Sequence, residues 1–167
     1  MKNKLQAVVI LLSICLLSWG NSIASQSEWE VYRSEKYGFE MLSPKGAKFE
    51  EREFKGGLGG LYAKHGVVEL FGLAHKGGAA TIEEIEEIGE EITGIHGEFW
   101  KKIDEGENEN GWKIYRAYQA KQGNIVLYAG LGTGPKGSYM LLLKTTADDV
   151  AKYEASYQKW YNSLKLF

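Results

Sequence analysis

Cysteine and histidine are scarce in this sequence of 167 residues, and their scarcity limits the chemistry open to it. The one cysteine, Cys15, rules out an intramolecular disulfide. The three histidines, His65, His75 and His96, include no close-spaced pair, so the ligand spacing of zinc sites is missing. We therefore expect no cofactor and no metal site, with a surface site built from His75 and a nearby carboxylate as the alternative.

An excess of basic charge is missing as well. The chain has 20 Lys and Arg against 22 Asp and Glu, and its formal net charge is -2 at pH 7. Loss of an N-terminal segment containing Lys2 and Lys4 would lower that charge further. Proteins that bind nucleic acid neutralise phosphates with clustered Lys and Arg. We therefore expect no nucleic acid among the partners.

The sequence also has no apolar run long enough for a typical membrane span. The longest run, 7–17, follows the basic residues Lys2 and Lys4 and is shorter than the roughly 20 residues of a spanning helix. Small residues at Ser22 and Ala24 stand at the two positions that a signal peptidase reads. This pattern predicts a secretory signal peptide, and a retained membrane anchor is the alternative.

Cleavage after Ala24 would define the mature protein. It would remove residues 1–24 and leave residues 25–167 as a single domain, periplasmic or secreted, with no membrane span. Lipid attachment at Cys15 would need a small residue before it, and Ile14 stands there instead. We therefore expect an exported protein without a lipid anchor.

Alternation of apolar and polar residues marks the start of the mature chain. Trp29 and Val31 alternate with polar residues, and Phe39 and Met41 alternate in the same way after a polar break. A period of two indicates β-strands, and the short break between the two runs indicates a tight turn. The mature protein is thus expected to open with a β-hairpin that ends at Pro44, which removes a ladder donor.

Further strands are expected between glycine-containing turns, at 61–64, 67–75, 99–104, 112–121, 125–131 and 139–143. The first two of these strands are joined by a two-residue turn at His65-Gly66. The strand at 67–75 is apolar on nearly both faces, which places it inside the sheet. The last strands follow one another through short turns and form an antiparallel meander.

Two segments show the spacing of amphipathic helices. Thr81 and Glu84 form a capping box before an apolar stripe of isoleucines, and Gly94 supplies a stop. Thr146 caps a C-terminal helix whose aromatic stripe includes Tyr157 and Trp160. The fold class is therefore α+β, with an antiparallel sheet of about six or more strands and helices packed on it.

The opening motif, Tyr32…Glu35-Lys36-Tyr37-Gly38-Phe39…Ser43-Pro44, resembles that of the PsbP-like (Mog1/PsbP) domains. The order of the expected elements is also similar, although Lys45-Gly46-Ala47 stands where that family often has a tryptophan. Members are mainly non-enzymatic extrinsic subunits, small exported lipoproteins or partners of other proteins. The resemblance implies a non-enzymatic binding or accessory domain with a protein partner in the cell envelope.

Glycine is abundant, at 21 residues, roughly twice its average frequency. Two glycine-rich segments carry the candidate partner-binding residues Leu58, Tyr62, Lys136 and Tyr139. A flexible loop at 56–60 beside an aromatic residue would suit a protein or glycan partner. The alternative is that the glycines serve turns and close packing and that Tyr139 is a sheet residue packed under a helix.

No catalytic residue can be assigned from the sequence. No serine has the pattern of a nucleophile elbow. Lys136 is followed by Gly137 rather than by Ser or Thr, which is the wrong order for a phosphate-binding loop. The six glutamates of the first helix would splay outward, whereas calcium needs converging oxygens. The alternative function is a hydrolase or another enzyme whose site is not recognisable in the sequence.

Overall fold

The computed structural model describes residues 29–77, 80–107 and 109–167, so the expected signal peptide and the start at Ser25 lie outside the described residues. The bounds of the strands and helices, in chain order, are β1 Trp29–Ser34, β2 Phe39–Pro44, β3 Lys48–Glu53, β4 Leu58–His65, β5 Val68–Lys76, α2 Ile82–Thr93, the 3₁₀ helix η2 Gly97–Phe99, β6 Trp100–Gly106, β7 Ile114–Gln122, β8 Ile125–Gly134, β9 Gly137–Thr146, α3 Ala147–Ser163 and β10 Lys165–Leu166.

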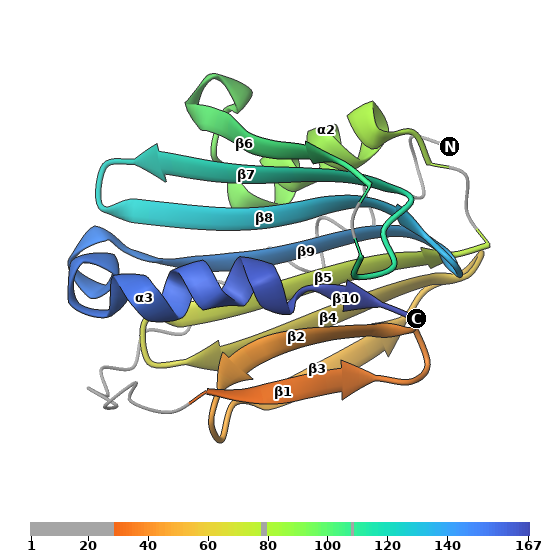
Figure 1. Cartoon of the computed structure of the whole chain (residues 1–167), viewed down its shortest axis with the longest axis horizontal. Helices are drawn as coiled ribbons and strands as arrows, with labels where there is room; N and C mark the ends of the chain where they lie inside the picture. Colours follow the sequence, from red (N-terminus) through yellow and green to blue (C-terminus); the bar gives the residue numbers. More distant parts are fainter. Residues whose placement is uncertain (1–28, 78–79, 108) are drawn as a thin grey trace.

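The strands form two antiparallel sheets (Figure 1). The larger sheet has seven strands in the order β3-β4-β5-β9-β8-β7-β6, and the smaller has three in the order β1-β2-β10. The chain runs through β3, β4 and β5 as hairpins, crosses to the far edge through α2, and returns by a meander from β6 to β9. The expected α+β class, including the C-terminal helix, is confirmed.

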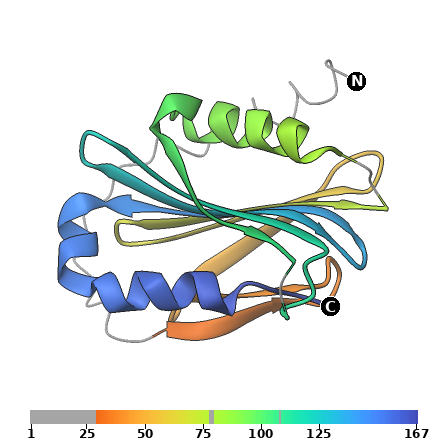
Figure 2. The same cartoon turned by 45° about the horizontal axis from the view of Figure 1, so that its top comes forward.

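The seven-stranded sheet is the middle layer of the molecule (Figure 2). Helix α2 packs on one of its faces over β8 and β9, whereas α3 and the small sheet lie on the other. Two hydrophobic clusters result, one on each face. The cluster under α3 and the small sheet includes Phe39, Tyr157 and Trp160, and the cluster under α2 includes Phe71, Ile85 and Leu142.

Local signals place helix α2 where the sequence predicts it. The Thr81 side chain accepts a hydrogen bond from the Glu84 N–H at 3.2 Å, and the Glu84 carboxylate accepts one from the Thr81 N–H at 3.0 Å. Gly94 ends the helix with φ 68°. The isoleucines at 82, 85 and 92 are buried against the sheet. Both ends of α2 are therefore set by side chains close in sequence.

Two strands were not expected from the sequence. Strand β3 exposes all of its residues except the half-buried Phe49, because it forms an edge and pairs only with β4. Strand β10 is two residues long and pairs with Glu40 and Phe39 of β2. Two predicted turns are also displaced. The β4–β5 turn is Gly66-Val67, because strand pairing extends to His65 and Val68. The β8–β9 turn, expected between the strands at 125–131 and 139–143, is confined to Pro135-Lys136, because pairing extends to Gly134 and Gly137.

Within residues 29–77, 80–107 and 109–167, no helix is long and apolar enough to cross a membrane.

Candidate functional site

The four candidate partner-binding residues do not form one cluster. Leu58 and Tyr62 lie two strand rows apart on the α2 side of β4. Tyr139 lies on the opposite face of the sheet, in the cluster under α3 and the small sheet. Lys136 lies in the β8–β9 turn at the end of the sheet. Only Leu58 and Tyr62 are therefore placed to act together.

Tyr139 is a core residue. Its side chain is 2% exposed, and its hydroxyl donates a hydrogen bond to the carbonyl of Tyr37 at 2.9 Å. Its ring also meets the Trp112 ring edge-on at 6.1 Å between centroids. Tyr139 is thus a packed sheet residue, as in the alternative reading of the sequence. Its hydroxyl links the large sheet to the β1–β2 turn.

Lys136 lies against the end of the chain. Its ammonium is 5.1 Å from the centroid of the Phe167 ring, and Phe167 donates its N–H to the Gly38 carbonyl at 3.0 Å. The Arg33 guanidinium lies over the same ring at 3.5 Å. Lys136 thus takes part in a cation–π cluster with Arg33 and Phe167 rather than in a surface with Leu58 and Tyr62.

Leu58 and Tyr62 belong to an apolar surface that α2 leaves uncovered. They flank Gly60 on β4, and the ring of Phe54 lies over Gly60, where an added Cβ would be 2.9 Å from it. Tyr62 contacts Phe71 at 5.2 Å between ring centroids. We call the three half-buried side chains Phe54, Leu58 and Tyr62 the β4 aromatic surface. It rests on buried side chains of β5.

The prediction of a flexible loop at 56–60 is wrong for residues 58–60, which belong to strand β4. Gly59 and Gly60 are buried residues of β4 and pair with Ala74 and Leu73 of β5. A Cβ on Gly59 would lie 2.1 Å from the ring of Tyr37, so glycine is required there by packing rather than by motion. The glycines of this segment let aromatic rings approach the backbone.

A row of charged residues runs across the sheet beside the β4 aromatic surface. Cross-strand pairing joins Lys48 to Lys64, Lys64 to Glu69, and Glu69 to Lys144. Lys64 donates a hydrogen bond to Glu69 at 3.2 Å, and the Lys144 ammonium is 3.7 Å from the other carboxylate oxygen. Directly opposed residues share one face of a sheet. We call Lys48, Lys64, Glu69 and Lys144 the lysine row.

A second charged group joins α2 to the far half of the sheet. Arg116 of β7 donates to Glu86 at 3.0 Å and to Glu83 at 3.4 Å on α2, and to Glu105 of β6 at 3.2 Å. Its hydrogen bond with Glu86 is the main cause that raises the pKa of Arg116. Tyr118 also donates to Glu86, and burial and that carboxylate raise the pKa of Tyr118 to about 12. These contacts attach α2 to β7, and Glu83 and Glu86 are paired with residues of the sheet rather than only solvated.

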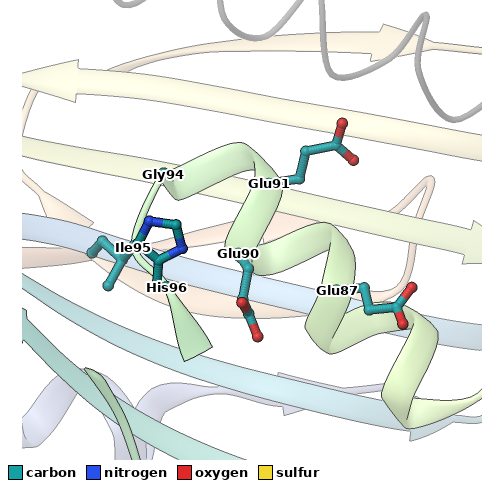
Figure 3. A pocket seen from close by; sticks show the side chains of 6 residues that line it. All are labelled: Glu87, Glu90, Glu91, Gly94, Ile95 and His96. Carbon is teal, nitrogen blue, oxygen red and sulfur yellow. The ribbon is translucent and has the colours of Figure 1, made fainter. Parts of the chain in front are cut away.

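The C-terminal end of α2 borders an open depression of about 400 Å³, lined by Glu87, Glu90, Glu91, Gly94, Ile95 and His96. Figure 3 shows the three carboxylates pointing in different directions. Glu90 accepts a hydrogen bond from the Gly97 N–H at 2.8 Å, so it holds the following turn. Within the described residues, no group of three or more His, Cys, Asp or Glu is placed to hold a metal ion.

The sequence did not reveal the lysine row or the place of Phe54. The residues of the lysine row lie on four different strands, β3, β4, β5 and β9, so only the strand register brings them together. A signal did exist within β4, where Leu58, Gly60, Tyr62 and Lys64 alternate with residues of the opposite face. That alternation could have placed Lys64 beside Tyr62.

No protein-family model and no curated protein matches the sequence. Among solved structures, the chain is similar to the cyanobacterial PsbP protein CyanoP of Synechocystis sp. PCC 6803, with a TM-score of 0.54 and 13% sequence identity over 90% of this chain and 99% of that one. A Pseudomonas aeruginosa protein of unknown function, described as a putative regulator, matches with a TM-score of 0.34 and 12% identity over 80% of this chain and 93% of that one. The similarity to CyanoP shows that the chain has the PsbP-like fold.

Proposed function

We propose that this protein is an exported, non-enzymatic binding or accessory domain that contacts another protein of the cell envelope through the β4 aromatic surface. The observation that carries the proposal is the position of Phe54, Leu58 and Tyr62, half-buried on the part of the sheet beside α2. Apolar and aromatic side chains with a charged rim are typical of protein interfaces. The lysine row supplies such a rim next to Tyr62.

The PsbP-like fold agrees with this proposal, because the resemblance in the opening motif implies accessory roles rather than catalysis. The fold alone does not determine function, which depends on the site. The β4 aromatic surface is such a site, since it combines apolar side chains with nearby charges. A partner that covers these side chains would remove their remaining exposed apolar area from water.

Export is tested by the N-terminus of the protein in its native cell. N-terminal sequencing of the exported protein should give Ser25 as the first residue, because Ala24 ends the signal-peptide pattern. Recovery of the protein with its full N-terminal segment in the cytoplasmic fraction would overturn the export part of the proposal. A lipid-modified start at Cys15 would instead replace the soluble form with an anchored one.

Binding is tested by capture of envelope proteins on the immobilised mature protein. Leu58→Asp and Tyr62→Ala should each weaken retention of the captured partner, because both change the proposed contact surface. Val31→Asp is the matched control, since Val31 is 62% exposed and lies on β1 in the small sheet. Circular dichroism should show that all three variants remain folded.

The proposal fails if the captured partner binds parent, Leu58→Asp and Tyr62→Ala equally while Val31→Asp weakens it. That result would move the interface to the small sheet. Retention that falls only for the two β4 variants would support the proposed surface.

A further inference from the structure

We propose that the partner segment bound at the β4 aromatic surface is acidic, with carboxylates that pair with the lysine row and an apolar side chain that packs against Tyr62. This rests on the proposed function and specifies the chemistry of its partner. Three features support it: the positive charge of the row, the position of the row beside the apolar side chains, and the opposite charge of α2.

The lysine row carries more positive charge than it neutralises internally. The row contains three lysines and one carboxylate, Glu69, which is flanked by Lys64 and Lys144 and whose side chain is 14% exposed. Lys64 is 36% and Lys144 20% exposed by side chain, and Lys48 is exposed at the sheet edge. A lysine ammonium has three donors, and Lys64 uses one on Glu69 at 3.2 Å. Donors therefore remain for carboxylates from outside.

The geometry of the row sets the spacing of those carboxylates. Lys48, Lys64, Glu69 and Lys144 lie on the adjacent strands β3, β4, β5 and β9. Neighbouring strands are about 4.8 Å apart, so the outer lysine backbones are separated by roughly 14 Å. The next row contains Glu50, Tyr62 and Phe71, directly beside the charges, and Glu50 is paired with Arg52 of the same strand at 3.4 Å. A short peptide segment can reach the lysines and the apolar side chains together.

The negative charges of the partner should be confined to a short segment rather than spread over an extended surface or chain. Six glutamates and no basic residue lie in α2. The helix packs on the face of the sheet that carries Tyr62 and Phe71, and the lysine row lies on the same face, two residues along each strand. An anionic bilayer or a long polyphosphate chain would extend from the row toward α2 and meet these carboxylates, and like charges repel. A protein segment can place its acidic residues on the row alone. Charge complementarity therefore favours an acidic segment of a protein.

A pair of synthetic peptides provides the direct test. The probe is a twelve-residue fluorescent peptide in which Asp and Glu alternate with Leu and Phe, and its twin carries Lys in place of each acidic residue. Fluorescence anisotropy with the mature protein should show at least about tenfold tighter binding of the acidic peptide. That binding should weaken as salt is raised, because exposed charges are screened.

Variants then locate the binding. Lys48→Glu should weaken the acidic peptide about tenfold, and it leaves the contacts of Glu69 with Lys64 and Lys144 in place. Lys144→Gln should weaken it by a smaller factor. Lys159→Glu is the matched control, because Lys159 is exposed on α3, on the other side of the sheet. It should leave the affinity unchanged.

Three results would overturn the inference. These are equal binding of the two peptides, equal loss with Lys48→Glu and Lys159→Glu, or binding of the mature protein to phosphatidylglycerol vesicles in preference to the acidic peptide. The proposed function fails separately. If a captured envelope partner is lost with Tyr62→Ala but not with Lys48→Glu, the surface stands and the acidic partner is wrong. If neither variant matters, the surface itself is wrong.

Discussion

The two faces of the seven-stranded sheet are covered in different ways. On one face, α3 and the small sheet enclose large aromatic side chains, and Tyr157 and Trp160 have no exposed surface. On the other face, α2 covers β8 and β9, whereas Phe54 and Tyr62 beside it remain half-buried. The first face is a closed core and the second combines a core with an accessible surface.

Glycine has a related but distinct role on each face. On the closed face, Gly130 lies where a Cβ would be 2.4 Å from the Leu164 side chain, and Gly59 lies under Tyr37. On the other face, Gly60 lies under Phe54, whose ring is half-buried and can shift outward. On the closed face, side chains packed against these glycines are therefore held in place. On the open face, the side chain packed against Gly60 can still move.

The largest effect is expected for Trp160→Ala. Trp160 is fully buried between α3 and the sheet, so the change removes a large side chain and leaves a cavity. The free energy of unfolding should fall by about 3–5 kcal/mol. Tyr62→Ala on the open face should cost less than about half of that, because part of its ring already faces solvent. Urea denaturation measures both, and equal costs would remove the proposed difference between the faces.

Gly59→Ala and Gly60→Ala compare the two faces at adjacent positions. The Gly59 Cβ would overlap the buried Tyr37 ring, so we expect a loss of about 1–3 kcal/mol. The Gly60 Cβ would be 2.9 Å from Phe54, which has room to move, so the loss should stay below roughly 1 kcal/mol. Thermal unfolding of the two variants gives the order. A larger loss for Gly60→Ala would show that the open face is packed more rigidly than the closed one.

The sequence could predict elements whose limits depend on nearby residues. Thr81, Glu84 and Gly94 define α2 within one chain segment, and Thr146 does so at the start of α3. Strands β3 and β10 could not be found, because charged residues fill one and the other has only two residues. Both are strands because a neighbouring strand supplies the hydrogen bonds, and that information is not local.

The candidate site could be predicted only in part, for the same reason. Residue type and glycine neighbours predict Leu58 and Tyr62 as partner-binding residues, and the two side chains do share a surface. Tyr139 fits the same pattern but points to the closed face. Strand β9 is apolar on both faces, so its sequence does not show which residues face which side of the sheet. The lysine row depends on the register of four strands, and two of these strands, β3 and β9, are far apart along the chain.

High pH should distinguish two tyrosines of β7 that lie on opposite faces. Burial, with a contribution from Asp104, raises the pKa of Tyr115 to about 12. The unfolded phenol ionises near pH 10, so its contribution to stability is complete below about pH 10 and is lost as pH rises toward 12. Tyr115→Phe should flatten the loss of stability in this window and change little at pH 7. Denaturant unfolding at several pH values measures it.

Tyr118→Phe provides the comparison, because the pKa of Tyr118 is also raised to about 12. Its hydroxyl donates to Glu86, so this variant should lose stability at pH 7 as well as flatten the alkaline loss. If both variants behave alike at pH 7, the Tyr118–Glu86 hydrogen bond does not contribute to the attachment of α2.

The smallest effects separate two neighbouring glutamates of α2. Glu86 is 26% exposed by side chain and accepts hydrogen bonds from Arg116 and Tyr118, so Glu86→Ala should cost about 1 kcal/mol. Glu87 is exposed at the open depression, and Glu87→Ala should change the free energy of unfolding by less than roughly 0.5 kcal/mol. Both substitutions introduce the same good helix former, so their difference isolates the contact with β7. Added salt should narrow that difference, because it weakens the Arg116 ion pair. Equal costs at low salt would mean that apolar packing alone holds α2 on its face of the sheet.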